Sequence, residues 1–152
     1  MANAQILPSY GGERAGQSAF TFLKNDMSVR SAGMGGASAA LPGDRYSGMQ
    51  NPAGLSSLSS SSFALSHIQL GGSLSQIGIL TSIPDKKASS AWGLSLNRIQ
   101  TPAYAERTEF QPEGTGYTLY SSQTSAGLSY SKQLTEQFQL GITLKSISES
   151  YT

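Results

Sequence analysis

The sequence predicts an all-β fold in which antiparallel strands form part of the wall of a transmembrane β-barrel. Three observations lead to this prediction. Charged residues make up only 12% of the 152 positions, and there are 27 serines against 19 charged residues. Most of the charges are confined to short connectors between long uncharged spans. Within those spans apolar residues alternate with Ser, Gly, Ala and Gln, which is the pattern of membrane-spanning strands.

The uncharged spans cover residues 46–84, 88–97 and 114–131, and the charges between them gather at 85–87 and 98–113. A soluble sheet usually places Lys, Glu or Thr on its solvated face, whereas here those positions carry small neutral residues. A soluble antiparallel sandwich or a secreted Ser/Gly-rich domain would also alternate. Such a soluble β-fold is therefore the alternative to a membrane barrel.

Composition excludes several functional classes. The net charge is +1 and the longest basic run is Lys86-Lys87, which is too little positive charge for a nucleic-acid surface. There is no cysteine, so disulfides and thiolate metal sites are excluded, and a single histidine leaves few pairings for nucleophilic catalysis. We therefore expect no enzyme, cofactor, metal or nucleic-acid partner. No run is long and apolar enough for a spanning helix.

The first three strands are expected at about residues 61–70, 73–83 and 89–99. In the first, Phe63, Leu65 and His67 share one face. The glycine pair at 71–72 predicts a tight hairpin with positive φ, and residues 84–87 predict a turn. In the third strand, Trp92, Leu94 and Leu96 oppose Gly93 and Ser95.

A connector at about residues 100–121 contains two prolines and is expected to be an exposed loop. Two further strands follow, at about 123–134 and 137–151. The fourth strand has Ala126, Leu128 and Tyr130 on one face, and the fifth has Phe138, Leu140, Ile142 and Leu144 on one face. Alternation of short turns with longer loops is typical of membrane barrels, so the short turns at 85–87 and 135–136 are expected at one end and the connector at the other.

The segment before the strands contains two motifs and no strand alternation. Residues 31–37 read Ser-Ala-Gly-Met-Gly-Gly-Ala, and residues 51–55 read Asn-Pro-Ala-Gly-Leu. The glycines interrupt any helix and allow the backbone to pack closely against a wall, while Pro52 fixes a turn that Asn51 can cap. From the residues alone, the segment can be interpreted either as a compact plug or as a flexible linker.

Together with the strand sequences at 127–132 and 140–145, the two motifs resemble PorV/PorQ-like outer-membrane proteins, which belong to the wider FadL-like barrels. The resemblance covers about residues 28–148. It implies an N-terminal extension at 1–27, a plug or hatch-like segment at 28–60, and the first strands of a barrel at 61–152. The plug motif that it implies comprises Gly33, Met34, Gly35, Gly36, Asn51, Pro52, Ala53 and Gly54.

The strand count departs from the family. Its barrel has about fourteen strands, whereas the alternation predicts five, and the smallest known membrane barrels have eight. The chain is therefore expected to be an N-terminal portion of a longer protein, or to need other chains to complete the barrel. The tripeptide Ala2-Asn3-Ala4 before Gln5 fits the small-residue rule for a cleavage site, which predicts the start of an exported chain.

The resemblance implies a non-enzymatic protein of the bacterial outer membrane that serves the type IX secretion system by binding or shuttling cargo at the cell surface. Membrane lipid and secretion-system proteins or exported cargo are the expected partners. The alternative is a FadL-like transporter that passes long-chain fatty acids or another hydrophobic small molecule, with the plug around residues 51–53 as its gate. A soluble secreted β-domain is the third possibility. The candidate partner-facing loop includes Tyr104, Arg107, Glu109 and Tyr117.

Other motifs in the sequence do not predict a catalytic or metal site. Residues 33–36 lack the third glycine of a dinucleotide-binding loop, and residues 93–97 and 127–131 lack the final glycine of a nucleophile elbow. The glutamates of the connector read as a solvated cluster rather than as calcium ligands. His67 has no second His or Cys beside it and is expected at an interface or facing a lumen. Aromatic belts at the two membrane interfaces, or core packing in a soluble fold, would account for Trp92, Tyr104, Tyr117, Tyr120 and Tyr130.

Overall fold

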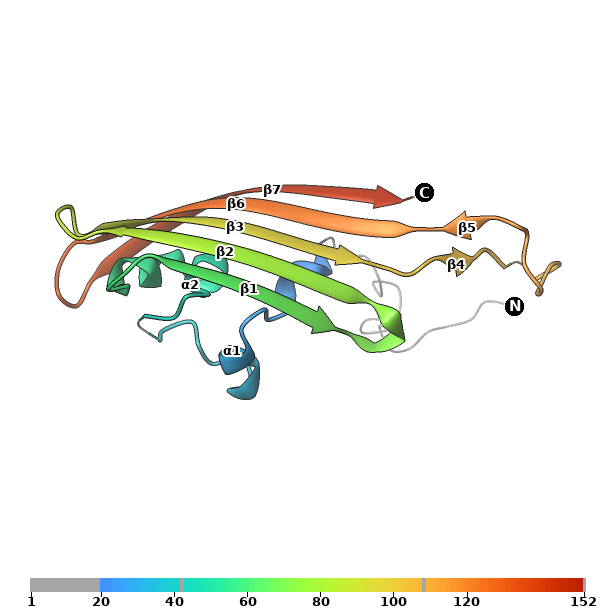
Figure 1. Cartoon of the computed structure of the whole chain (residues 1–152), viewed down its shortest axis with the longest axis horizontal. Helices are drawn as coiled ribbons and strands as arrows, with labels where there is room; N and C mark the ends of the chain where they lie inside the picture. Colours follow the sequence, from blue (N-terminus) through green and yellow to red (C-terminus); the bar gives the residue numbers. More distant parts are fainter. Residues whose placement is uncertain (1–19, 42, 108, 152) are drawn as a thin grey trace, which may run out of the picture.

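The computed structural model describes residues 20–41, 43–107 and 109–151, and most of these residues form one antiparallel β-sheet (Figure 1). The sheet has the order β1-β2-β3-β6-β7, so each strand pairs with its sequence neighbour within the sheet. The strands are β1 (Ser62–Gln69), β2 (Ser75–Asp85), β3 (Ser90–Gln100), β6 (Ser121–Gln133) and β7 (Gln139–Tyr151). The all-β antiparallel prediction and its five strands are confirmed. The described strands form an open sheet with β1 and β7 at its edges, and not a closed barrel.

The connector between β3 and β6 was expected to be a loop, and that prediction was incomplete. It contains a second, two-stranded sheet made of β4 (Tyr104–Ala105) and β5 (Thr118–Leu119). The backbone N–H of Glu106 donates to the carbonyl of Tyr117 at 2.9 Å, which extends this pairing. The small ribbon continues past the end of the main sheet as a narrow projection (Figure 1).

The connections between strands alternate between the two ends of the sheet, and the long connector and the short turns at 86–89 and 134–138 lie at opposite ends, as predicted. The β2–β3 and β6–β7 turns lie at one end, and the β1–β2 connection and the long connector lie at the other (Figure 1). Gly72 has a φ of 69°, as expected, but Ser73 also has a positive φ of 62°. Because Leu70 N–H donates to the carbonyl of Leu74, the turn consists of the three residues 71–73 rather than of the two glycines alone.

The turn expected at residues 84–87 is shifted toward the C-terminus. Strand β2 continues through Pro84 and Asp85, which pair with Ala91 and Ser90. The chain reverses after Asp85, whose carboxylate accepts hydrogen bonds from the N–H groups of Lys87 and Ala88 at 3.0 and 3.3 Å. A side-chain carboxylate that bonds backbone two residues on is a common way of fixing a turn, so Asp85 ends the strand and Pro84 does not.

The segment before β1 covers one face of the main sheet with short helical turns (Figure 1). They are η1 (Thr21–Lys24), α1 (Val29–Gly33), α2 (Ser47–Gln50) and η2 (Pro52–Ser57), and a further turn, η3 (Gly71–Ser73), joins β1 to β2. The expected irregular and short-helical segment is confirmed. None of the helices in the described parts of the chain is long and apolar enough to span a membrane. Residues 2–4, predicted to be a cleavage remnant, lie outside the described residues.

The two faces of the sheet are inverted relative to a soluble sheet that packs its apolar face inward. The face covered by the N-terminal segment buries serines, and the opposite face exposes large hydrophobic side chains. The hydrophobic cluster under the segment consists of Leu55, Leu58 and Ala91. The buried serines on the covered face are Ser66, Ser82, Ser95, Ser125, Ser129 and Ser131, while Ser90, which is also buried, lies on the opposite face.

Candidate functional site

The Asn-Pro-Ala-Gly-Leu motif is the anchor between the N-terminal segment and the sheet. Leu55, in η2, is completely buried and lies over Gly93 of β3, where an added Cβ would be 2.8 Å from the Leu55 Cδ1 atom. Gly48 of α2 lies on another side of Leu55, and a Cβ there would be 3.5 Å from both of its methyl groups. Leu55 therefore occupies a socket that exists because two glycines have no side chains.

The turn at Asn51 is fixed as the sequence predicted. Its side-chain oxygen accepts a hydrogen bond from Ala53 N–H at 3.2 Å, and Pro52 occupies the first turn of η2. The Asn51 amide also donates to the carbonyl of Ala39 at 2.8 Å. This second bond ties η2 to the loop after α1, so one side chain both caps the turn and connects two parts of the segment.

Close backbone approach occurs at Gly141 of β7 and at Gly54. A Cβ added to Gly141 would overlap the backbone nitrogen of Ala53 and lie 2.5 Å from the carbonyl carbon of Pro52. A Cβ added to Gly54 would lie 2.8 Å from the hydroxyl oxygen of Ser47. The close approach between segment and sheet therefore depends on Gly141, a glycine of the sheet, whereas Gly54 packs against Ser47 of α2 within the segment itself.

The prediction that glycines allow tight packing against the wall is wrong for the first glycine motif. Gly33, Gly35 and Gly36 are exposed, and a Cβ added at any of them would meet no atom within 4 Å. Gly35 and Gly36 instead have φ values of 64° and 84°, a backbone conformation that glycine adopts without steric cost. Met34, between them and α1, is 42% exposed. These residues turn the chain after α1 and do not contact the sheet.

A buried amide network joins the start of the segment to the middle of the sheet. Gln76 of β2 is completely buried, and its amide nitrogen donates to Asn97 Oδ1 at 2.9 Å and to the carbonyl of Phe22 at 3.3 Å. Its oxygen accepts from Asn25 Nδ2 at 2.7 Å. Phe22 and Met27 are also buried, so the packed segment includes residues that precede the predicted boundary at 28.

A second network holds the loop after α1. Asp26 Oδ1 accepts from Ser28 N–H and from Gln50 Nε2, each at 3.0 Å. Gln50 also donates to Ser31 Oγ at 3.1 Å and accepts from Ser38 Oγ at 2.7 Å. The other carboxylate oxygen of Asp26 is buried and has no hydrogen-bond partner among the described residues. The sequence analysis missed both networks, although Gln76 and Asn97 stand out as amides at inward positions of otherwise small-residue strands.

The segment also bonds to the C-terminal half of the sheet. Ser129 Oγ donates to the carbonyl of Gly48 at 3.2 Å and is 2.8 Å from Thr143 Oγ1. Lys145 Nζ donates to the carbonyl of Met49 at 3.3 Å. Ser57 and Gln139 exchange side-chain bonds at 2.9 and 3.2 Å. Contacts to β2, β3, β6 and β7 together hold residues 20–57 against the serine-rich face of the sheet, called the inner face below, and this segment is called the plug.

A cavity of about 560 Å³ lies between this plug and the sheet. Met27 and Met49 contribute apolar walls, and Lys24 and Lys145 contribute cations. A volume of this size falls in the range that small-molecule ligands occupy. Among the residues that also line it are Asn25, Asp26, Tyr46, Gln50, Asn97 and Ser125.

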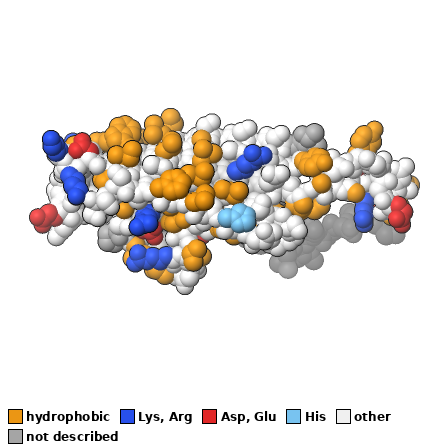
Figure 2. Space-filling model, in the orientation of Figure 1, with side chains coloured by type: hydrophobic (Ala, Val, Ile, Leu, Met, Phe, Trp, Pro, Cys, Tyr) orange, Lys and Arg blue, Asp and Glu red, His pale blue; other side chains and the backbone are white. Residues whose placement is uncertain are grey.

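The outward face of the sheet carries a continuous apolar band (Figure 2). Strand register aligns its side chains in rows across the sheet, for example Leu65, Ile79 and Leu96, or Ile83, Trp92, Tyr130 and Ile142. Several are more than half exposed, with Leu144 at 78%, Ile142 at 68% and Phe63 at 62%. The other exposed members are Leu65, Ile77, Ile79, Ile83, Trp92, Leu94, Leu96, Leu128 and Leu140.

Charged residues bound this band at both ends. Arg98 of β3 pairs with Thr124 of β6 at one border, and Lys132 of β6 pairs with Ser90 of β3 at the other. The two borders are eight residue steps apart along β6, which at about 3.3 Å per step corresponds to roughly 26 Å. The rings of Trp92 and Tyr130 contact each other one row inside the Lys132 border, with centroids 4.8 Å apart. His67 is exposed in the row of Arg98.

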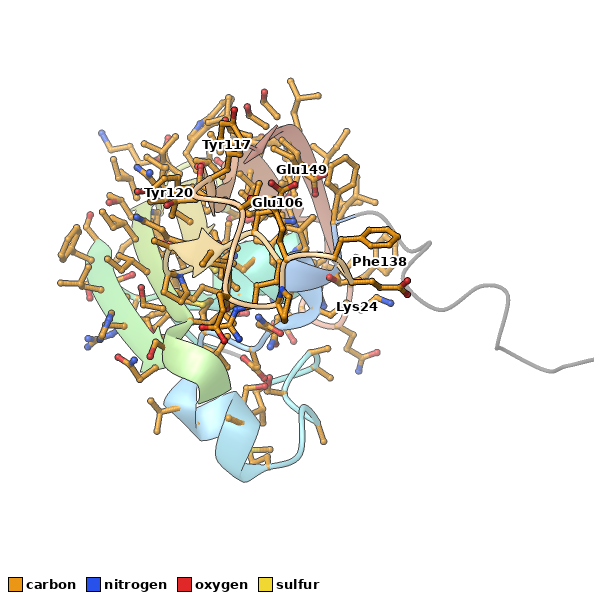
Figure 3. The ribbon with its side chains drawn as sticks, turned by 90° about the vertical axis from the view of Figure 1, so that its right-hand side faces the viewer. Lys24, Glu106, Tyr117, Tyr120, Phe138 and Glu149 are labelled. Atoms are coloured by element: carbon orange, nitrogen blue, oxygen red, sulfur yellow. The ribbon has the colours of Figure 1, made fainter. Side chains whose placement is uncertain are left out.

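The candidate partner-facing residues all lie on the projecting connector and are exposed. Tyr104 is 47% and Tyr117 72% exposed, and Arg107 and Glu109 are exposed as well. Figure 3, which views this end of the molecule, shows Tyr117, Tyr120 and Glu106 on it. Phe110, which the sequence analysis did not single out, is 93% exposed.

The connector glutamates do not form a cation site in the described part of the chain, where no group of three His, Cys, Asp or Glu residues is suitably placed for a metal ion. Glu106 instead accepts a hydrogen bond from Thr115 Oγ1 at 2.6 Å. This bond belongs to the β4–β5 ribbon and helps to hold its shape.

Comparison of the chain with protein-family models, with curated proteins and with solved structures finds no match.

Proposed function

We propose that this chain forms part of the wall of an outer-membrane β-barrel, together with the plug that lies inside it. The observation that carries the proposal is the apolar band on the outward face, bounded by Arg98 and Lys132. A soluble monomer rarely exposes so large a contiguous apolar surface, because contact with water is costly for every apolar side chain. Contact with lipid removes that cost.

The dimensions of the band support this proposal. Membrane-spanning strands use about 9–11 residues tilted from the membrane normal. The stretch from Thr124 to Lys132 is nine residues long, and a tilt of about 40° reduces its roughly 26 Å to about 20 Å, within about 5 Å of the roughly 25 Å apolar height of an outer-membrane barrel. The inward face, with serines, glycines and buried amides, fits a polar barrel interior.

The edges of the sheet support a larger assembly. Strands β1 and β7 each have one neighbour in the described sheet, so one side of each presents unpaired backbone groups. Unpaired backbone groups are not tolerated in lipid. Further strands, from this polypeptide or from other chains, complete the wall in the proposed barrel.

Within this class, the proposed role is that of a PorV/PorQ-type protein in type IX secretion, non-enzymatic, which binds or shuttles cargo at the cell surface. Two features support a binding role. The plug is bonded to the sheet from both α2 and η2, and the β4–β5 ribbon projects beyond the band with exposed aromatic side chains. Exposed aromatic residues on a projecting loop are typical of protein contact sites.

Fractionation of membranes from the native host tests the proposal. The protein is expected in the outer-membrane fraction, with an electrophoretic mobility that changes on heating. Recovery in the aqueous fraction without detergent would support a soluble secreted β-domain and overturn the proposal.

The secretion role needs a separate measurement. Cross-linking in intact cells, followed by purification, is expected to recover secretion-system proteins or exported cargo. Replacement of Phe110 and Tyr117 by serine is expected to reduce this recovery, whereas the same replacement of Phe138, at the opposite end of the sheet, serves as the matched control. Equal recovery from all variants would argue against the loop as the contact surface.

A FadL-like transporter is the second candidate, and the cavity beneath the plug favours it. A pocket of about 560 Å³ with Met27 and Met49 beside Lys24 and Lys145 has the mixed character that a fatty acid requires. Uptake of a labelled long-chain fatty acid is expected to fall when Asn51→Ala loosens the plug. Unchanged uptake would oppose gating by this motif, and no uptake by the unmodified protein would oppose transport.

A further inference from the structure

The outward face changes from apolar to polar at a single row of paired residues near the long connector. His67 pairs with Ile77, Ile77 with Arg98, and Arg98 with Thr124. Figure 2 shows a histidine and a basic side chain at the border of the hydrophobic patch. Beyond this row the outward positions are polar and uncharged; they are Gln69, Ser75, Gln100, Ser122 and Ser150.

The charge at this border is not neutralised within the described residues. The outward positions of the five strands include one carboxylate, Asp85, and it belongs to the opposite border, where Lys132 lies in the same row. Within the described part of the chain, neither Arg98 nor His67 forms a side-chain hydrogen bond or an ion pair. An unpaired guanidinium at the edge of an apolar surface attracts an anion that also has an apolar part.

We propose that Arg98 and His67 bind the phosphate group of a membrane lipid whose acyl chains lie on the apolar band. This inference rests on the proposed membrane location of the band. The guanidinium presents a planar set of N–H donors that matches phosphate oxygens, and the imidazole ring offers a further N–H donor. The Thr124 hydroxyl, beside Arg98 in the same row, is a third possible donor.

The spacing suits a group of this size. Strands β1 and β3 are separated by β2, so the backbones at His67 and Arg98 lie about 10 Å apart. Two side chains that lean toward each other over Ile77 can therefore share one phosphate. The acyl chains then continue from the phosphate over the next apolar row, formed by Leu65, Ile79 and Leu96.

Native mass spectrometry of the purified full chain in a neutral detergent tests the proposal. The probes are phosphatidic acid and phosphatidylcholine with identical acyl chains. The unmodified protein is expected to retain phosphatidic acid preferentially. Arg98→Gln is expected to weaken that binding about tenfold or more, because a charged hydrogen bond is lost. Arg98→Lys is expected to restore part of the affinity, since it keeps the charge and loses the planar set of donors.

Lys132→Gln is the matched control, because it removes a basic residue from the opposite border of the band. It is expected to leave phosphatidic acid binding unchanged. Equal weakening by Lys132→Gln would show general electrostatic attraction and overturn the site. Unchanged binding by Arg98→Gln would overturn it as well.

Two competition experiments identify the source of the anion. Millimolar inorganic phosphate is expected to displace little phosphatidic acid, because it lacks the acyl chains; full displacement would mean that a free anion is recognised and would overturn the lipid proposal. Displacement by a soluble polyglutamate peptide would favour an acidic protein partner instead and would also overturn it.

The same preparations separate this inference from the proposed function. Heat-dependent mobility and outer-membrane recovery are measured for the unmodified protein and for Arg98→Gln. If the unmodified protein enters the membrane but shows no lipid preference, only the lipid site fails. If it does not enter the membrane, the proposed function fails with it.

Discussion

Leu55 is buried directly over Gly93, and a side chain on Gly93 would have to occupy the place of the Leu55 methyl group. The two residues come from η2 and β3, 38 positions apart in the chain. Their fit holds the plug at the centre of the inner face. Because the hydrophobic cluster here contains only Leu55, Leu58 and Ala91, the loss of one apolar contact is a large fraction of what holds η2 in place.

Gly93→Ala is therefore expected to destabilise the folded protein by about 1–3 kcal/mol, the usual cost of overpacking. Leu55→Ala is expected to cost about 2–5 kcal/mol, because it empties the same socket. Urea unfolding measures both changes. Gly71→Ala is the control, since a Cβ there meets no atom within 4 Å. If Gly93→Ala and Gly71→Ala have the same free energy of unfolding, Leu55 does not pack as tightly against Gly93 as the structure indicates.

A second prediction concerns Gly141, which has the backbone of Pro52 and Ala53 against it. Gly141→Ala is expected to push η2 away from β7 and to increase amide hydrogen exchange across residues 47–57. Gly33→Ala, where nothing lies within 4 Å, is the control and is expected to leave exchange unchanged. If exchange across residues 47–57 is as slow in Gly141→Ala as in Gly33→Ala, the contact between Gly141 and η2 does not hold this part of the plug in place.

The buried amide of Gln76 gives a third prediction. Gln76→Leu removes the partner that Asn25, Asn97 and the Phe22 carbonyl share. The buried Asn97 oxygen is then left unpaired, which costs about 1–3 kcal/mol, while the Phe22 carbonyl still accepts from Asn25 N–H. Limited proteolysis is expected to cut residues 20–30 faster in this variant. Gln69→Leu, an exposed position on β1, provides the comparison. Equal cleavage in both variants would show that the network does not hold this part of the plug.

The fourth prediction tests the outward band. Leu94 is 56% exposed near the middle of the band, which faces lipid in the proposed barrel. On that proposal Leu94→Arg is expected to reduce assembly in the outer membrane, because a charge at the membrane midplane costs about 2–4 kcal/mol. Gln100→Arg, beyond the border row, is expected to assemble normally. Outer-membrane recovery measures both. Normal assembly of Leu94→Arg would place the band away from lipid.

The strands were predictable because alternation is a local property. In β3 every second residue from Trp92 to Leu96 is apolar, and in β6 and β7 the same period holds, so the faces follow from the sequence by counting. The turn after β2 was misplaced because its position depends on the Asp85 carboxylate, which reaches forward to the backbone of Lys87 and Ala88. The β4–β5 ribbon was missed because strands of two residues have no period to detect.

The plug motifs were found, but their roles were only partly predicted. Asn51 and Pro52 form a local turn, which sequence identifies directly. Gly35 and Gly36 were expected to contact the wall, yet they are exposed, and their role is to adopt positive φ angles where the chain turns. Both uses of glycine look identical in a sequence, and only the position of the neighbouring elements distinguishes them.

By itself the sequence determined the antiparallel strands, the apolar and small-residue faces, and the position of the long connector, because each depends on residues close together in the chain. The tertiary structure decided which glycines receive the plug, that Gln76 links Phe22, Asn25 and Asn97, and that Arg98 and His67 share one row. These relationships join residues that are far apart in the chain, and strand register and packing fix them only when the sheet and the plug come together.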